Sequence, residues 1–215
     1  MIVENSQVPN SSEFIKILPS DKHSRNYETF LPQSQSDKNR NVIEVHSGYL
    51  SSSILNSDGF RFGTRIFESG DVLFLNQNFP TELSSFRSEV LLSISKSDDV
   101  HNFDSKANIY RIEGENLASC INSGVYRKLD FNLKAVLAYI IDKYGREIGS
   151  IKYLPSELRL THEFLAEVVN GTRAPITAEI KKLRIKVGEA NFGLYSKTRT
   201  YYMSTELIQE TLSKI

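Results

Sequence analysis

The chain has 215 residues, of which 40% are hydrophobic and 24% charged, and its 26 Lys and Arg balance 26 Asp and Glu. This composition is ordinary for a globular protein and allows one large domain or two small ones. No apolar run approaches the roughly 20 residues that a membrane-spanning helix needs, and no signal peptide follows Met1. Cys120 is the single cysteine, which excludes an internal disulfide, a CxxC zinc site and a four-cysteine iron–sulfur cluster. We therefore expect a cytoplasmic protein without a membrane partner, metal or other cofactor.

The charges are unevenly distributed along the chain. Residues 127–215 contain 15 Lys and Arg against 10 Asp and Glu, whereas residues 1–126 contain 11 against 16. Between residues 171 and 203 the basic residues outnumber the acidic ones by seven to two. An acidic half joined to a basic half is typical of a sensor domain fused to a DNA-binding domain.

The first half of the chain predicts β structure. Residues 1–40 are polar, and from Asn41 short β-rich segments alternate with turn signals at Ser47–Gly48, Ser57–Gly59 and Ser69–Asp71. The predicted strands are 42–46, 49–55, 60–67, 72–75, 88–95 and 107–112. Several short strands at this spacing are typical of an antiparallel barrel or a jelly roll.

Helical patterns follow the strands. Residues 113–121 predict a short helix, and a longer amphipathic helix is predicted to begin near Asp130 and to end near Gly145. The apolar stripe of the longer helix consists of Leu133, Val136, Leu137, Ile140, Ile141 and Tyr144. A short strand at 150–154 is predicted in the connector that follows.

The stretch from Leu158 to Leu183 predicts two short helices joined by a tight turn. Thr161 is placed to cap the first helix, because its hydroxyl can accept a hydrogen bond from an unpaired backbone N–H. The face predicted to be buried consists of Phe164, Leu165, Val168 and Val169. Asn170 and Gly171 tolerate the left-handed conformation that ends a helix.

The second helix of this stretch is predicted from Thr172 to Leu183. Thr172 can cap it, and Pro175 falls in its first turn, where a missing N–H costs little. Its buried stripe is predicted to be Ile176, Ile180 and Leu183.

The opposite face of this second helix is small, polar and basic. It consists of Arg173, Ala174, Thr177, Ala178 and Lys181. A helix that enters the DNA major groove needs this character, because small residues allow close approach and an arginine can bind guanine through two hydrogen bonds. An αα-hairpin with a solvated face fits the same spacing.

We predict that Arg173 reads bases, with Ala174, Thr177 and Ala178 beside it. Phosphate contacts are predicted for Thr161, His162, Thr172, Lys181, Lys182, Lys197 and Arg199.

A β-hairpin is predicted after the second helix. Residues 192–195 and 200–203 can pair across Ser196–Arg199, which places Lys197 and Arg199 at the tip. A surface hairpin fits this pattern, but its place after the two helices favours the wing of a winged helix. Ser204 can cap a last helix at residues 205–212.

The two-helix stretch resembles the helix-turn-helix of the Crp–Fnr family of bacterial transcription regulators. The matching residues are Leu160–Thr161, Leu165–Ala166, Val168–Val169, Thr172–Arg173 and Lys181–Leu183. The family usually carries Thr/Ser-Arg-Glu-Thr-Val at the start of its recognition helix, where this chain has Thr-Arg-Ala-Pro-Ile at 172–176. The arginine is kept and the glutamate is absent, which implies an altered base preference.

The strands resemble the sensor domain of that family, a double-stranded β-helix, through Gly48, Asp58–Gly59 and Gly70–Asp71. The resemblance implies an α+β protein with a cupin-like jelly-roll sensor at residues 1–121, a linker at 122–130 and a winged helix-turn-helix domain at 131–215. It further implies double-stranded DNA, a second copy of the chain and RNA polymerase as partners. The family's long dimer helix is predicted to be shortened here, because Asn122–Gly124 interrupts the chain.

Cyclic-nucleotide-binding members of the family carry a Gly-Glu pair and a later Arg-Ser or Arg-Thr that holds the cyclic phosphate. Arg87 and Ser88 match the second part, but no Gly-Glu pair precedes them. We therefore do not expect cyclic AMP, and we treat Arg87 and Ser88 as candidates for contacts to an unknown small-molecule effector.

Two other functions stay open. One is a cupin-like small-molecule-binding protein whose C-terminal domain docks a protein partner, and the other is a regulator whose barrel is only a scaffold. The histidines form no His-x-His pair, and no Ser-His-Asp, paired-carboxylate or glycine-rich phosphate motif stands out. The sequence therefore does not predict an enzyme.

Overall fold

The computed structural model describes residues 13–17, 27–30, 41–55, 61–74, 81–86, 88–96, 129–169 and 171–214. The chain divides into two compact units, Met1–Glu115 and Asn116–Ile215. Within the described residues, the N-terminal unit consists of strands, and the C-terminal unit combines four helices with a small sheet. The mixed α and β character with antiparallel sheets agrees with the class that the sequence predicts.

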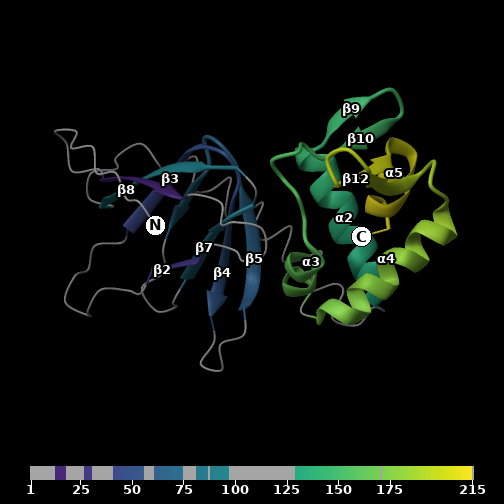
Figure 1. The fold of residues 1–215 in the computed structure, drawn as a ribbon, viewed down its shortest axis with the longest axis horizontal. Helices are drawn as coiled ribbons and strands as arrows, with labels where there is room; N and C mark the ends of the chain where they lie inside the picture. Colours follow the sequence, from purple (N-terminus) through teal and green to yellow (C-terminus); the bar gives the residue numbers. More distant parts are fainter. Residues whose placement is uncertain are drawn as a thin grey trace. The chain divides into compact units, whose positions relative to one another are not determined.

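The N-terminal unit contains two four-stranded antiparallel sheets (Figure 1). The first has the order β1-β8-β3-β6, with bounds Glu13–Ile17, Val90–Lys96, Asn41–Ser47 and Val72–Phe74. The second has the order β2-β7-β4-β5, with bounds Tyr27–Phe30, Thr81–Ser85, Leu50–Leu55 and Arg61–Phe67.

One apolar core joins the two sheets, because its buried residues come from strands of both. They are Ile43, Val45, Leu73, Val90 and Leu92 from the first sheet, and Leu50, Phe67 and Leu83 from the second. Residues two apart in a strand share a face, so Ile43 and Val45 of β3 both reach this core. Burying each side chain of this kind contributes about 1.5–3 kcal/mol to folding.

Gly48 makes the predicted turn between β3 and β4. Its φ is +83°, and a Cβ atom at this residue would lie 2.4 Å from the backbone oxygen of Glu89. A side chain is therefore excluded both by the backbone conformation and by the neighbouring chain.

The predicted and observed strands agree best where apolar residues recur. The predictions at 42–46, 49–55, 60–67, 72–75 and 88–95 correspond to β3, β4, β5, β6 and β8. Strands β2 and β7 were not predicted, and β1 was predicted only as a short helix or strand. The predicted turn at Ser57–Gly59, strand at 107–112, helix at 113–121 and shortened dimer helix lie outside the described residues.

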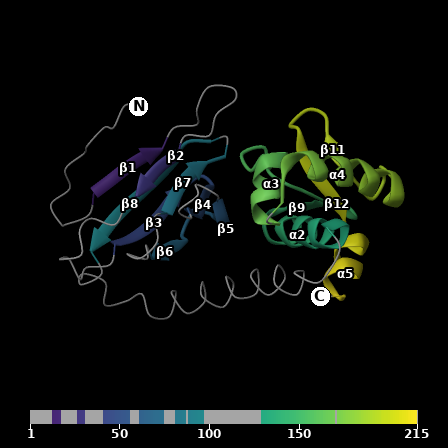
Figure 2. The same ribbon diagram turned by 90° about the horizontal axis from the view of Figure 1, so that it is seen from below.

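The C-terminal unit places its helices around an antiparallel sheet of order β11-β12-β10-β9 (Figure 2). The strands are Phe192–Tyr195, Thr200–Ser204, Ile151–Tyr153 and Arg146–Ile148. The helices are α2 (Leu129–Tyr144), α3 (His162–Val168), α4 (Arg173–Val187) and α5 (Thr205–Leu212). None of the described helices has the length and apolar composition that crossing a bilayer requires.

Helix α2 is the centre of this unit, because α4, α5 and β12 all pack against it. The six residues of its predicted apolar stripe are all buried, as are Ala135 and Ala138. Ser204 caps α5 as predicted, since its hydroxyl accepts a hydrogen bond from the Leu207 N–H at 3.3 Å.

Candidate nucleic-acid interface

Helix α3 begins as its sequence predicts. The hydroxyl of Thr161 accepts a hydrogen bond from the Phe164 N–H at 3.0 Å, which satisfies one of the unpaired donors of the first turn. Phe164, Leu165 and Val168 are buried, whereas Val169 is half-buried. This apolar face anchors α3 within the unit and leaves Thr161 exposed.

The turn between α3 and α4 differs in detail from the prediction. Gly171 donates its N–H to the Ala166 oxygen at 2.7 Å, but it does not adopt the predicted left-handed conformation. Asn170 lies outside the described residues. Thr172 precedes α4 in an extended conformation, yet its side chain makes no capping hydrogen bond, so the predicted cap is wrong. Its hydroxyl is not engaged at the helix end.

Helix α4 exposes the face that the sequence singles out. Ile176 and Ile180 are buried and Leu183 is half-buried, which fixes the orientation of the helix. The exposed residues on the other side include Arg173, Ala174, Ala178, Lys181 and Lys182, while Thr177 is half-buried. The αα-hairpin and the helix-turn-helix both require this arrangement, so the character of the exposed side chains distinguishes them.

The cations of α4 fall into two groups. Lys182 forms an ion pair with Glu179 at 2.5 Å, and this hydrogen bond raises the pKa of the Lys182 ammonium above its usual value. Arg184 pairs with Glu189. Within the described part of the chain, Arg173 and Lys181 have no acidic partner. They are therefore the α4 charges best placed to bind an external anion.

Helix α4 continues four residues beyond the predicted end at Leu183 and stops at Val187. The extension adds the exposed cations Arg184 and Lys186, which the sequence analysis did not name. The signal for this end was Gly188, which follows the helix with a φ of +81°.

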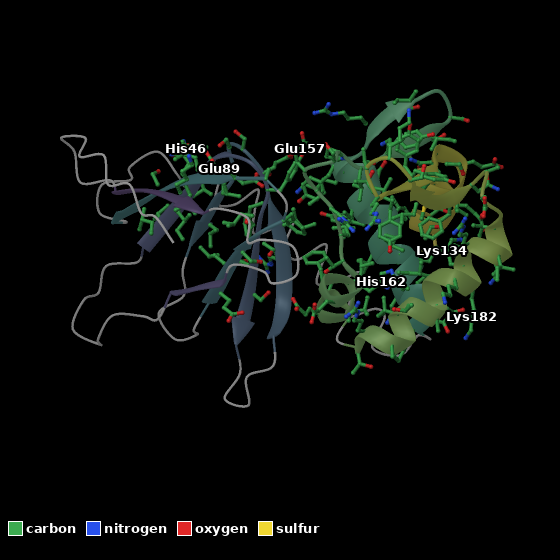
Figure 3. The ribbon with its side chains drawn as sticks, viewed as in Figure 1. His46, Glu89, Lys134, Glu157, His162 and Lys182 are labelled. Atoms are coloured by element: carbon green, nitrogen blue, oxygen red, sulfur yellow. The ribbon has the colours of Figure 1, made fainter. Side chains whose placement is uncertain are left out.

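His162 connects α3 to α4 through a side-chain hydrogen bond. Its Nδ1 atom lies 2.8 Å from the Thr177 hydroxyl, which in turn donates to the Arg173 backbone oxygen at 3.0 Å. Because the single hydroxyl proton goes to that oxygen, Nδ1 carries the proton that Thr177 accepts. Figure 3 shows His162 where α3 meets α4.

This arrangement makes Nε2 the nitrogen whose protonation changes the charge of His162. Burial, and then the positive charge of Arg173 on α4, lower the pKa of the imidazole below its usual value of 6.5. The unbound protein therefore holds His162 neutral near neutral pH. A neutral ring with Nδ1–H offers only an acceptor at Nε2, and it becomes a donor there when a proton is added.

The predicted β-hairpin is present after α4. Strands β11 and β12 are antiparallel and are joined by Ser196–Arg199, with Lys197 and Arg199 exposed. Arg199 has a φ of +55°, and its N–H donates to the Tyr195 oxygen at 2.8 Å to close the turn. The two cations therefore lie on a short, hydrogen-bonded loop.

Close contact between chain and side chain fixes the start of this hairpin. The Tyr202 hydroxyl donates to the Glu189 backbone oxygen at 2.7 Å. Its ring lies over Gly193, where a Cβ atom would be 2.5 Å from the hydroxyl oxygen. The hairpin is thereby tied to the segment that follows α4.

The effector candidates are only partly described. Arg87 lies outside the described residues. The Ser88 hydroxyl is buried without a hydrogen-bond partner in the described part of the chain, and the same holds for Ser85 at the end of β7. Nearby in the second sheet, Ser51 and Ser84 are hydrogen-bonded to each other at 2.5 Å. The sequence analysis did not identify this serine-rich region of β4 and β7.

No protein-family model matches the chain, and no curated protein matches it. Solved structures do match over nearly its whole length. A CRP/FNR-family transcriptional regulator from Thermus thermophilus is 13% identical, with a TM-score of 0.63 over 94% of this chain and 98% of that one. A CooA mutant from Carboxydothermus hydrogenoformans is 15% identical, with a TM-score of 0.60 over 91% and 92%. FixK2 from Bradyrhizobium japonicum is 14% identical, with a TM-score of 0.57 over 88% and 98%.

These structures share with this chain the order of a β-sheet unit followed by a unit of helices and a small sheet. Their sequences have diverged so far that the likeness concerns the fold. The chain therefore has the fold of CRP/FNR-family transcription regulators.

Proposed function

We propose that this chain is a sequence-specific DNA-binding transcription regulator of the Crp–Fnr type, and that α4 is its recognition helix. The observation that carries the proposal is the exposed face of α4, where Arg173 and Lys181 flank small side chains and have no acidic partner in the described residues. A solvated surface helix has no need of small residues between two cations, whereas a helix in the major groove does.

In this arrangement Arg173 reads a base, with Ala174, Thr177 and Ala178 beside it. Lys181, Lys182, Lys197 and Arg199 bind phosphates, and Thr161, His162 and Thr172 bind phosphates at the start of the two helices. The exposure of the four cations supports these roles. The tie between the β11–β12 hairpin and the end of α4 supports its role as a wing.

The N-terminal unit acts in this proposal as a jelly-roll sensor, a double-stranded β-helix at residues 1–121, with a linker at 122–130 and the DNA-binding domain at 131–215. The two sheets around one apolar core support the sensor architecture. The unpartnered Ser88 hydroxyl supports a polar effector contact, while cyclic AMP is not proposed as that effector. The regulator works in the cytoplasm and catalyses no reaction.

A homodimer is the proposed assembly on DNA, with two half-sites about 34–36 Å apart, one turn of the double helix. RNA polymerase is the further partner that such a regulator would contact. Sedimentation of the full chain with and without its operator tests the dimer, and a monomer in both cases would exclude it.

Gel-shift titration of the full chain against random duplex DNA at low salt tests the function itself, followed by selection of bound sequences from a random pool. Arg173→Ala should weaken binding to the selected sequence by about 1–3 kcal/mol and relax the preference at one base pair. Arg146→Ala is the matched control, because Arg146 is exposed on β9, at the opposite edge of the sheet from β11.

Binding of Arg173→Ala with unchanged affinity and preference would remove that residue from base reading. Absence of any DNA binding would remove the proposed function. A small-molecule-binding protein whose C-terminal unit docks a protein partner is not favoured by any feature of α4.

A further inference from the structure

The reading face of α4 lacks hydrogen-bond acceptors of the usual kind. Its residues are Arg173, Ala174, Thr177, Ala178 and Lys181, so it has no carboxylate and no amide. Adenine is usually read by Asn or Gln and the cytosine amino group by Asp or Glu. Glu179, the carboxylate closest along the helix, is half-buried and paired with Lys182.

Thr177 does not supply the missing acceptor, because its hydroxyl is already engaged. It donates to the Arg173 backbone oxygen and accepts from Nδ1 of His162. Two interactions of this kind hold the hydroxyl toward the protein. The groups that this face offers to bases are therefore the donors of Arg173 and Lys181 and the methyl groups of two exposed alanines.

We infer that Ala174 and Ala178 read the 5-methyl groups of thymines, so that the operator half-site combines guanine with thymine. The inference rests on the proposed function and adds the class of sequence that α4 recognises. Among the major-groove edges of the four bases, only thymine presents a methyl group, and an alanine side chain packs against it.

The spacing of the two alanines fits base-pair geometry. Residues four apart lie on one face of a helix and about 6 Å apart along its axis, which is close to two base-pair steps of about 3.4 Å. Basic side chains lie on the same helix at both ends of the pair, Arg173 before it and Lys181 after it. This charge pattern favours a nucleic acid over an apolar protein surface as the occupant.

Replacement of thymine by deoxyuridine tests the inference, because it removes one methyl group and leaves every hydrogen-bonding group unchanged. The full chain is titrated against its selected operator and against versions with uracil at each thymine of one half-site. We expect two positions at which uracil weakens binding about fourfold each, the effect of one buried methyl group.

Variants of the protein then assign the two positions. Ala174→Gly and Ala178→Gly should each abolish the difference between thymine and uracil at one position and keep it at the other. Because each ratio compares two DNAs with the same protein, a loss of helix stability in a glycine variant cancels.

Ile185→Ala is the matched control. Ile185 is 84% exposed on α4, about 16 Å along the helix from Ala174, beyond a groove about 12 Å wide that receives the N-terminal end. This variant should keep both ratios.

The outcomes separate the inference from the proposed function. Tight, sequence-dependent binding that is insensitive to uracil, or a selected site without thymine, overturns the inference and leaves the DNA-binding function standing. Ratios that persist in both glycine variants also overturn it. Absence of binding to any DNA overturns both.

Discussion

Removing the two wing cations should change the salt dependence of DNA binding by a calculable amount. Each phosphate neutralised by a Lys or Arg contributes about 0.9 to the slope of log K against log salt concentration. Lys181, Lys182, Lys197 and Arg199 are exposed, so four contacts predict a slope of about −3.6 per protomer. Lys182 already pairs with Glu179, which reduces its contribution, and with three effective contacts the slope would be about −2.7.

The variant Lys197→Gln/Arg199→Gln removes two of these charges, and the slope should become shallower by about 1.8 per protomer. Glutamine at residue 199 meets the same backbone conformation as arginine, φ +55°, so the turn is retained. Fluorescence anisotropy of a labelled operator, titrated at several salt concentrations between about 50 and 200 mM, measures the slope.

Arg146→Gln, the same type of charge change on β9, should leave the slope unchanged. A double variant with the wild-type slope would refute the wing contact, even if its affinity had fallen for another reason. A control variant with an equal reduction would mean that the slope reports net charge and not contacts.

Two further predictions follow from α3 and α4. If His162 binds a phosphate through Nε2, the complex takes up a proton, so affinity should rise as pH falls from the higher pKa of the complex through 6.5 toward the lowered pKa of the unbound imidazole. The rise is at most about tenfold per pH unit per protomer, and anisotropy should find it absent in His162→Gln. Ile176→Ala, at a fully buried residue between α4 and its unit, should lower the free energy of unfolding by about 2–5 kcal/mol in denaturant titration.

Each of these predictions has its own contradiction. The same pH dependence in wild type and His162→Gln would assign it to another group. Folding supplies an independent check with the opposite sign, because the lowered pKa of His162 means that stability falls as pH drops below 6.5. For Ile176, the control is Ile185→Ala, which should stay within about 0.5 kcal/mol of wild type because the side chain is exposed.

The elements around the proposed interface could be predicted because their signals are local. The Thr161 cap, the apolar stripe of α2, the buried Ile176 and Ile180 and the β11–β12 hairpin depend on residues that are close together in the chain. Helical periodicity and turn residues are read within one or two turns of chain, and the packing around them agrees with that local preference.

Tertiary structure decided what depends on distant residues. Strand β2 is short and its pattern is weak, and it forms a strand by pairing with β7, in the register Tyr27↔Ser84. The hydroxyl of Thr177 is unavailable to DNA because His162, fifteen residues earlier, is hydrogen-bonded to it. Neither partner can be found from local periodicity, because hydrogen bonds between separate elements depend on how those elements pack, and packing is a property of the folded chain as a whole.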